Sequence, residues 1–356
     1  MPKVSIILPT YNRLLRLQKV LAGLAAQSYP RDDMEVVIVS DGSSDGTNSF
    51  LQGDVAPLRI RPFIQANQGP AAARNLGLQA AQGELVIFID DDVVPEPHLV
   101  AEHVKTHQQH PGDVVVLGPM LTPPNFVLKP WVAWEQAMLY KQYADIAAGR
   151  WAPTARQFYT GNASLARRHV VAMGGFDVTL RRAEDVELAY RLADRGFTFV
   201  FNDQAIGYHY ADRTFASWLQ TPYQYGRNDV IFTRDRGQRW LLPKIMAEFQ
   251  QRHTFVKGLT RLCLSRRQVS KLAVQGLCRA ATASNDAGLP TFAQRLYSGI
   301  FNLSYYQGIA DELHKGIADK LQGRQHFFAL AAQAAVLKMA DRPMTGVQMA
   351  RSSEGR

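Results

Sequence analysis

The chain has 356 residues, more than one domain usually holds, so a large domain followed by a smaller region is expected. Its residues are 46% hydrophobic and 20% charged, a composition that excludes a disordered or fibrous protein. The net charge of +9 leaves nucleic acid, an anionic membrane and an anionic substrate open as partners. Cys263 and Cys278 lack the spacing of a metal or redox motif, so we expect both to be reduced.

No secretory signal pattern precedes the first expected strand. The longest apolar stretch near the C-terminus is shorter than the roughly 20 residues that span a membrane. We therefore expect a cytoplasmic protein that is either soluble or peripheral on the inner face of the membrane.

Short runs of β-branched and apolar residues alternate with helical patterns over the first hundred residues. Four runs are expected to be strands, at residues 4–9, 34–40, 58–65 and 84–90. Near-continuous apolar strands joined by helices predict an α/β fold with a mostly parallel sheet covered on both faces. In such a sheet, ligands bind outside the carboxyl ends of the strands.

Two of the connecting segments have clear helical signals. Leu14, Leu17, Leu21 and Leu24 keep the spacing of one helical face. The segment 69–83, "GPAAARNLGLQAAQG", has a proline where a first-turn proline belongs, and its final glycine is expected just past the end of the helix. These helices would connect neighbouring parallel strands.

Each expected strand ends in a polar, turn-forming segment: "PTYNR", "SDGSSDGT", "QANQG" and "DDDVVPEP". Tyr11 could stack on a nucleotide base, and Asp41 could accept a hydrogen bond from its ring. Neither the dinucleotide-binding glycine motif nor the P-loop motif is present, so phosphate would have to be held in another way. Ordinary solvated loops would also be polar, and the segments taken singly do not decide between the two interpretations.

Asp90, Asp91 and Asp92 stand together at the end of the fourth expected strand. One interpretation is a solvated turn that caps the next helix, because aspartate favours such positions. The other is a cation site, since a divalent ion neutralises clustered carboxylates. Mg²⁺ or Mn²⁺ shared between Asp90, Asp92 and a substrate diphosphate would suit these oxygen ligands.

Five segments in this order resemble the family 2 glycosyltransferases, which are inverting enzymes with the GT-A fold. They are "VSIILPTYNR", "VVIVSDGSSDGT", "NQGPAAARNLGL", "GELVIFIDDDVVPEP", and "GGFD" followed by "AEDVELAYRL". The resemblance covers roughly residues 3 to 212. It implies transfer of a sugar from a nucleotide-diphosphate sugar, most commonly a uridine diphosphate sugar, to a hydroxyl acceptor. Cell-surface polysaccharide or glycolipid synthesis would be the setting.

The resemblance also implies roles for the strand-end residues. Pro9, Tyr11 and Asp41 would hold the nucleotide base, with Arg74 nearby. The three aspartates would form the D-x-D motif.

Within that motif, Asp92 would be the direct metal ligand, and Asp90 or Asp91 would face the ribose. Asp90 would also support the metal. A lone histidine such as His209 is more often structural, but the family places one near the metal or the diphosphate.

Asp185 lies in the first turn of an expected helix in "AEDVELAYRL". Acidic residues at this position complement the helix dipole, which is the simpler explanation. The resemblance implies instead that Asp185 is the base that takes the proton from the acceptor. Glu184, Gly161 and Asn162 would line the acceptor side, although a turn would explain the last two equally well.

The alternating pattern stops after residue 213, which divides the chain into two expected domains. Residues 1–213 would be catalytic, with a nucleotide-sugar half to about 120 and an acceptor half from 121. Residues 214–356 would be a helical, basic region, frayed over its last 16 residues.

The basic and aromatic residues of the second region suit an anionic membrane surface, and then the acceptor would be a lipid-linked glycan. A solvated basic face on a helical bundle explains them equally well. Nucleic acid is the least favoured partner, because no recognised nucleic-acid module is present.

Two other functions remain open from the sequence. A nucleotidyltransferase would use a related sheet, but its glycine- and lysine-rich phosphate loop is missing. A non-enzymatic, receiver-like module could hold Mg²⁺ on the aspartates. The tyrosine in the first loop, the acidic helix start and the length of the chain argue against it.

Overall fold

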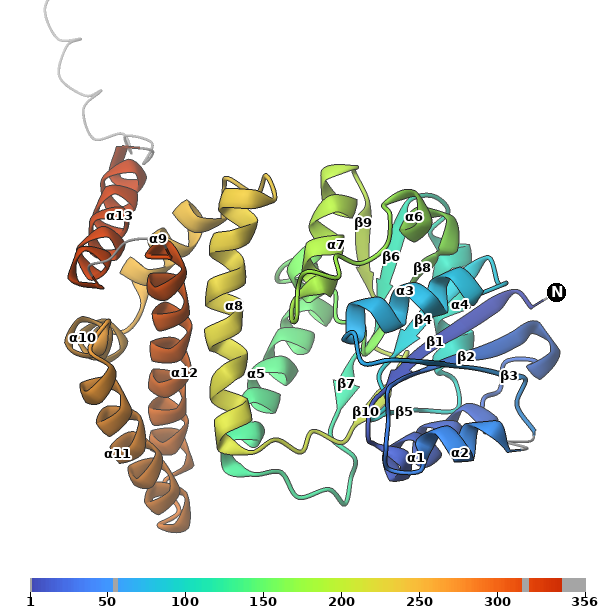
Figure 1. The fold of residues 1–356 in the computed structure, drawn as a ribbon. Helices are drawn as coiled ribbons and strands as arrows, with labels where there is room; N and C mark the ends of the chain where they lie inside the picture. The colour runs from blue at the N-terminus through green and yellow to red at the C-terminus, as the bar shows by residue number, and fades with distance from the viewer. Residues whose placement is uncertain (1, 54–56, 316–319, 341–356) are drawn as a thin grey trace, which may run out of the picture. The chain divides into compact units, whose positions relative to one another are not determined.

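The computed structural model describes residues 2–53, 57–315 and 320–340, so the C-terminal segment expected to fray lies outside the described residues. The chain divides into two compact units, Met1–Thr214 and Phe215–Arg356 (Figure 1). The boundary lies one residue from the position at which the alternating sequence pattern stops. Each unit is described by itself below.

The N-terminal unit is built on a seven-stranded sheet with the strand order β3-β2-β1-β4-β8-β6-β9. Its strands are β1 (Val4–Thr10), β2 (Met34–Asp41), β3 (Ile60–Gln65), β4 (Leu85–Ile89), β8 (Asn162–Ala166), β6 (Val114–Leu117) and β9 (Thr198–Phe201). The first four are parallel, and β8 runs antiparallel between β4 and β6. The α/β class and the mostly parallel sheet are therefore confirmed.

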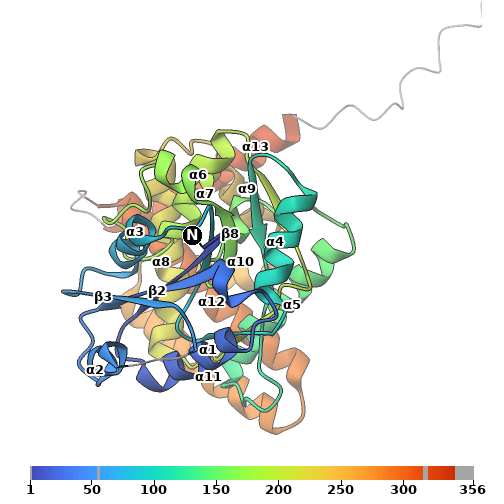
Figure 2. The same cartoon turned by 90° about the vertical axis from the view of Figure 1, so that its right-hand side faces the viewer.

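Helices cover both faces of this sheet (Figures 1 and 2). One face packs on α1 (Leu14–Ala25), α2 (Thr47–Gln52) and α4 (Leu99–Gln109). The other packs on α3 (Pro70–Ala80), in which Gly77 lies against the side chain of Ile7. Each buried leucine or isoleucine of this core contributes about 1.5–3 kcal/mol. The sheet edge that carries the site is thus held by a core on both sides.

The predicted end of α3 is wrong by a few residues. The helix stops at Ala80, and Gly83 lies beyond it rather than just past its last turn. A side chain at Gly83 would begin only 2.6 Å from the backbone nitrogen of Ser5. The glycine is therefore needed for close contact with β1, and not for the helix end.

A second, three-stranded sheet has the order β5-β10-β7. It consists of β5 (Val93–Pro95), β10 (Gly207–His209) and β7 (Met120–Leu121). Because β5 follows directly after the three aspartates and pairs antiparallel with β10, His209 is placed opposite Val93. This small sheet brings the histidine to the aspartate cluster.

The remaining helices of the unit are α5 (Pro130–Ala147), α6 (Arg167–Ala172) and α7 (Glu184–Asp194), with short 3₁₀ turns at Arg31–Asp33 and Ala155–Gln157. Helix α7 begins with the acidic residues of the "AEDVELAYRL" segment, as predicted.

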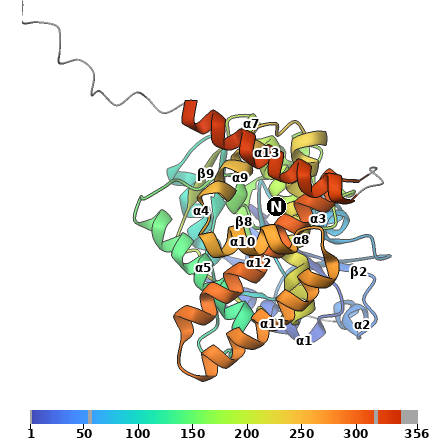
Figure 3. The same ribbon diagram turned by 90° about the vertical axis from the view of Figure 1, so that its left-hand side faces the viewer.

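The C-terminal unit is helical, as predicted from its sequence (Figure 3). Its helices are α8 (Phe215–Asp235), α9 (Leu241–Gln251), α10 (Thr254–Cys263), α11 (Arg267–Asp286), α12 (Pro290–Leu313) and α13 (Lys320–Ala340). Helix α12 packs along α8 at the fully buried Trp218 and Tyr297, and its Tyr306 packs on Phe249 of α9. Within the described parts of the chain, no helix combines the length and apolar character needed to cross a membrane.

Candidate active site

The loops that follow β1 and β2 are tied together by side chains. Asn12, which has a left-handed backbone with φ 52°, accepts a hydrogen bond from the Ser44 amide at 2.7 Å. Asp45 accepts one from the Leu14 amide at 2.9 Å, which stabilises the start of α1. The polar ends of neighbouring strands therefore meet at one sheet edge, as the sequence predicts.

Asp41 connects the end of β2 to the loop before α3. Its two oxygens accept hydrogen bonds from the amides of Gln68 and Gly69, each at 2.8 Å, and from the side chain of Gln65 at 2.7 Å. The ring of Tyr11 stays accessible, with 49% of the residue exposed, which a stacking role requires. Nucleotide binding by Pro9, Tyr11 and Asp41 stays a prediction.

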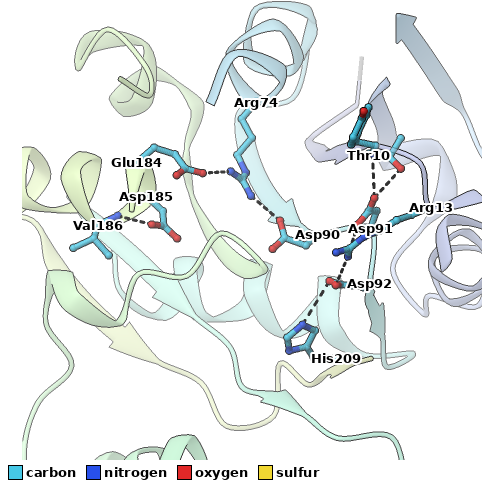
Figure 4. A network of polar contacts seen from close by, with 11 residues as sticks. Thr10, Arg13, Arg74, Asp90, Asp91, Asp92, Glu184, Asp185, Val186 and His209 are labelled. Carbon is cyan, nitrogen blue, oxygen red and sulfur yellow. Dashed lines mark hydrogen bonds and ion pairs between the residues drawn. The ribbon is translucent and has the colours of Figure 1, made fainter. Parts of the chain in front are cut away.

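Asp91 is buried and holds the β1 loop to the end of β4. It accepts a hydrogen bond from Thr10 Oγ1 at 2.8 Å, and its other oxygen lies 3.1 Å from Arg13 Nη1 (Figure 4). Burial raises the pKa of Asp91 to about 6, against the lowering effect of the Arg13 charge. Asp91 is therefore an anchor between the two loops.

Asp92 lies between a guanidinium and an imidazole. It pairs with Arg13, and His209 Nε2 lies 3.6 Å from its Oδ1 (Figure 4). Burial alone would raise the pKa of Asp92, yet the neighbouring His209 and Arg13 outweigh it and hold the pKa well below its usual range. This carboxylate is ionised at neutral pH and is compensated by positive charge.

Asp91 and Asp92 contact Arg13, whereas the side chain of Asp90 points toward α3 and α7. Arg74 lies between two carboxylates, with Nη2 2.7 Å from Asp90 Oδ1 and Nη1 2.7 Å from Glu184 Oε1 (Figure 4). The Arg74 and Glu184 side chains are only 6% and 7% exposed, so their pair is shielded from water, whereas the Asp90 side chain is 37% exposed. The guanidinium thus links the aspartate cluster to the start of α7.

Asp185 is the residue of α7 that follows Glu184. Its Oδ1 accepts a hydrogen bond from the Val186 amide at 2.8 Å. Burial, together with the adjacent Glu184 charge, raises the pKa of Asp185 to about 7. Such a pKa suits a general base at neutral pH.

Ala183 directly precedes α7 and has an unusual backbone. Its φ of 60° and ψ of 23° place a residue with a Cβ in the left-handed region. This conformation costs roughly 1–2 kcal/mol for a residue other than glycine. Strain of this kind is concentrated at functional sites, and here it sets the direction in which Glu184 and Asp185 enter the site.

Residues 5–173 match the family model described as "Glycosyl transferase family 2". The N-terminal unit is a family 2 glycosyltransferase domain. This enzyme class replaces the nucleotidyltransferase and the receiver-like module as the interpretation of the aspartate cluster.

A curated relative, "Glycosyltransferase AglE" of Haloferax volcanii, is 28% identical to this glycosyltransferase over 247 residues, which is 69% of this chain and 76% of the relative. Three further relatives are matched over only 51% to 64% of their own length.

Two solved structures share the fold. One is the mannosyltransferase PcManGT from Pyrobaculum calidifontis in complex with GDP-Man and Mn²⁺, with a TM-score of 0.52, 21% identity, and coverage of 96% of this chain and 88% of that one. The other is a TarS fragment of S. aureus in complex with UDP-GlcNAc, with a TM-score of 0.53, 20% identity, and coverage of 88% and 91%. Both confirm the GT-A fold of the glycosyltransferase.

The two residues expected on the acceptor side after residue 160 differ in their surroundings. Gly161 lies beside the aspartates, since a side chain there would begin 3.2 Å from Asp90 Oδ2. Asn162 is buried instead. Its amide donates to two backbone carbonyls at 2.9 and 2.7 Å, and its oxygen lies 2.9 Å from His103 Nε2. The Asn162 side chain thus braces the sheet, and its role on the acceptor side stays a prediction.

Arg74 and Asp90 have contacts that their predicted roles do not include, and those roles stay predictions. Arg74 is expected near the nucleotide, but its guanidinium is used by Asp90 and Glu184. The structure does not bring Asp90 together with Asp92 and His209. Among the described residues, no three His, Cys, Asp or Glu side chains converge as a preformed metal site.

Arg13 is the site residue that the sequence pattern did not single out. It stands at the end of "PTYNR", where an exposed arginine is unremarkable. The parallel register gives the missing signal, because Ile7 of β1 lies opposite Phe88 of β4. Three residues further along each strand, Thr10 and Asp91 meet, and Arg13 follows at the next loop.

Proposed function

We propose that this protein is a metal-dependent, inverting glycosyltransferase that moves a sugar from a nucleotide-diphosphate sugar to a hydroxyl acceptor. One observation carries the proposal. One network of charges contains two carboxylates with different pKa values: Asp92 is ionised, and Asp185 has a pKa of about 7. Arg74 and the aspartate loop, residues 90–92, connect the two. Two carboxylates with separated pKa values can serve one reaction in two roles.

The chemistry of the Asp92 end fits a divalent cation. Mg²⁺ and Mn²⁺ are commonly held by one or two carboxylates together with substrate phosphates, so a complete protein cage is not required. Asp92 and His209 would supply the protein ligands, and Arg13 now provides the positive charge that Asp92 needs. A bound cation would stabilise the departing diphosphate. Asp90 as a further ligand stays a prediction.

Asp185 would act as the general base. Its ionised carboxylate would take the proton of the acceptor hydroxyl while that oxygen attacks the anomeric carbon. The bond from the anomeric carbon to the diphosphate oxygen would break on the opposite side, which inverts the configuration. The raised pKa supports this role, because a stronger base near the working pH removes the proton more effectively.

Arg74 would position the base. It is 5% exposed and is held by Asp90 on one side and by Glu184 on the other. Since Glu184 precedes Asp185 in the first turn of α7, this ion-pair chain fixes the base relative to the aspartate loop. Precise placement of reacting groups is worth several orders of magnitude in rate.

The donor would be a nucleotide-diphosphate sugar, and a uridine diphosphate sugar is the first to test. One solved structure with this fold holds UDP-GlcNAc and another holds GDP-Man with Mn²⁺, which supports both nucleotides as candidates. The acceptor would be a glycan or a lipid-linked glycan. Tyr11, accessible at the sheet edge, would stack on the base.

The metal role can be tested with Asp92→Asn. We expect the wild type to bind UDP in a Mn²⁺-dependent way in calorimetry and to hydrolyse the correct donor slowly, and the variant to lose both. Asp203→Asn, a change at a surface turn in the same unit, serves as the control. Metal-dependent UDP binding of wild-type strength in Asp92→Asn would refute the assignment.

The base is tested with Asp185→Asn. This variant should still bind the donor with Mn²⁺ but should lose transfer to the acceptor, because only proton removal is affected. Asp194→Asn, an exposed position in the last turn of the same helix, should transfer at the wild-type rate. Transfer by Asp185→Asn at the wild-type rate would show that the base is another group.

A further inference from the structure

A stretch of the C-terminal unit contains basic residues and no acidic ones. From His253 to Asn285 the sequence has no aspartate or glutamate. Over the same stretch it carries six lysines and arginines: Lys257, Arg261, Arg266, Arg267, Lys271 and Arg279. This stretch forms α10 and α11 (Figure 3). Without acidic neighbours in the sequence, these side chains give the two helices a strong local positive charge.

Large apolar side chains are exposed on the same two helices. Phe255 and Leu262 of α10 are 37% and 56% exposed, and Val269 and Leu272 of α11 are 37% and 68% exposed. The outward side chains of both helices, basic and apolar together, are called the α10–α11 face below. Scattered apolar residues are normal on a surface. Four of them within 18 residues of a stretch without acidic residues make a surface that is both basic and apolar.

Helix α11 packs along α12, but few of its residues are fully buried. Over its 20 residues only Ala281 is buried. Val269, Leu272 and Arg279 are separated by three and seven positions, so they lie along one side of the helix. An amphipathic helix normally buries its apolar side in its own domain. Here an apolar and basic side is left exposed to solvent.

We propose that the α10–α11 face binds the surface of a membrane that contains anionic lipids. Lysine and arginine side chains are attracted to the lipid headgroups, and the apolar side chains between them can enter the boundary with the acyl chains. Nucleic acid would attract the basic side chains but would gain nothing from the exposed leucines and valine on this face. The mixed chemistry therefore favours a bilayer.

The inference goes beyond sugar transfer, because membrane binding needs neither donor nor metal. If it fails, the proposed transferase activity is unaffected, and if the transferase proposal fails, vesicle binding can still be measured. The two ideas are related only through the acceptor: a protein held at the membrane surface would reach a lipid-linked acceptor more readily.

The test is co-sedimentation of the full chain with vesicles, either of phosphatidylcholine alone or with 30% phosphatidylglycerol added, as a composition chosen for the assay. We expect binding to the anionic vesicles only, and its loss at high salt because the charges are screened. Each basic side chain near such a surface strengthens binding about fivefold. Lys271→Gln with Arg279→Gln should therefore weaken binding about 30-fold.

Leu272→Ser tests the apolar part separately and should weaken binding several-fold at unchanged charge. The matched control is Arg59→Gln with Arg168→Gln, two exposed positions of the N-terminal unit that remove the same charge. It should bind like the wild type. Thermal unfolding of each variant shows whether it is folded.

Four results would overturn the proposal. The first two are equal binding of the wild type to both kinds of vesicle, and weakening in the control that equals the weakening in the α11 variants. The third is binding of duplex DNA or RNA by a protein that does not bind vesicles. The fourth is a protein that does not bind vesicles but self-associates, with the self-association abolished by Leu272→Ser. Anionic-vesicle binding that weakens in both α11 variants and not in the control supports it.

Discussion

The two units of this protein use buried charge in different ways. In the N-terminal unit, five carboxylates from the aspartate loop and the start of α7 share the cations Arg13 and Arg74. In the C-terminal unit, the buried carboxylate of Glu312 lies 2.8 Å from Arg227, 3.1 Å from Arg234 and 3.9 Å from Lys315, and Arg234 also pairs with Asp235. Carboxylates are in excess in the first network and cations in the second.

This difference separates a reactive site from a structural one. Where carboxylates outnumber cations, burial and mutual repulsion raise pKa values, as they do for Asp91 and Asp185. Glu312 is 1% exposed but fully compensated, and it fastens α12 to α8. An excess of buried negative charge is stable only if a cation is supplied or a proton is retained, and both suit a transferase site.

The largest expected effect is on catalysis. Asp185→Asn should lower the rate of transfer about 10²- to 10⁴-fold, the usual contribution of a general base. In the wild type, the rate should rise about tenfold from pH 6 to pH 8, because a base with a pKa of about 7 ionises over that interval. A pH–rate profile measured at saturating acceptor checks this. A rate that stays level from pH 6 to pH 8 would contradict the assignment.

The corresponding change in the second network should affect stability instead. Glu312→Gln removes the charge that two arginines share, so we expect the free energy of unfolding to fall by about 2 kcal/mol. The arginines are 30% and 46% exposed and can turn to water, which limits the loss. Urea unfolding of the variant measures it, and UDP binding at low temperature should be unchanged. Loss of UDP binding in a folded variant would show that the two networks do not differ in this way.

The ionised form of Asp185, which the proposed catalysis requires, should also lower the free energy of unfolding. Its pKa is raised in the folded protein, so its contribution to stability is present below the unfolded value near 4 and is lost as the pH rises through about 7. Asp185→Asn removes this loss, so we expect the variant to be more stable than the wild type at pH 8. The gain should shrink toward pH 5. A gain of the same size at both pH values would mean that ionisation is not its cause.

The smallest effect concerns Arg13. Its guanidinium contacts Asp91 and Asp92, and therefore competes with a divalent cation for the same charge. In Arg13→Gln we expect Mn²⁺ to bind about fivefold more tightly in the absence of donor, corresponding to about 1 kcal/mol for a partly exposed pair. Titration followed by the electron paramagnetic resonance of free Mn²⁺ measures this, with Arg16→Gln as the control. Weaker Mn²⁺ binding in Arg13→Gln would mean that the arginine helps to form the site.

Much of the first unit could be predicted from local patterns. The apolar runs predicted β1, β2, β3 and β4, and the spacing of the leucines in 14–25 predicted α1. The end of α3 could not be predicted, because Gly83 serves a contact with β1 that lies 78 residues away in the sequence. Local propensity describes a segment alone, whereas such a contact depends on which strands are neighbours.

In the candidate site, too, some features could be predicted from the sequence and others depend on tertiary contacts. Asp92, His209 and Asp185 could be named as candidates only through the resemblance to the family, because residue type and position alone favoured simpler explanations for His209 and Asp185. Arg13 and the linking role of Arg74 could not, because an arginine in a loop or on a helix has no distinctive pattern. The burial of Asn162 could not be predicted either, because it depends on β8 lying between β4 and β6.

The sequence by itself determined the class of fold, the polar sheet edge and the chemistry of the aspartates, because hydrophobic periodicity and residue type act over a few neighbouring positions. Only the tertiary structure decided how the charges are shared. The parallel register of β1 and β4 brings Arg13 to Asp91, the pairing of β5 with β10 brings His209 to Asp92, and the packing of α3 brings Arg74 between Asp90 and Glu184. Those pairings join positions up to 117 residues apart, as in the pair of Asp92 with His209, and they set the pKa values on which the proposed chemistry depends.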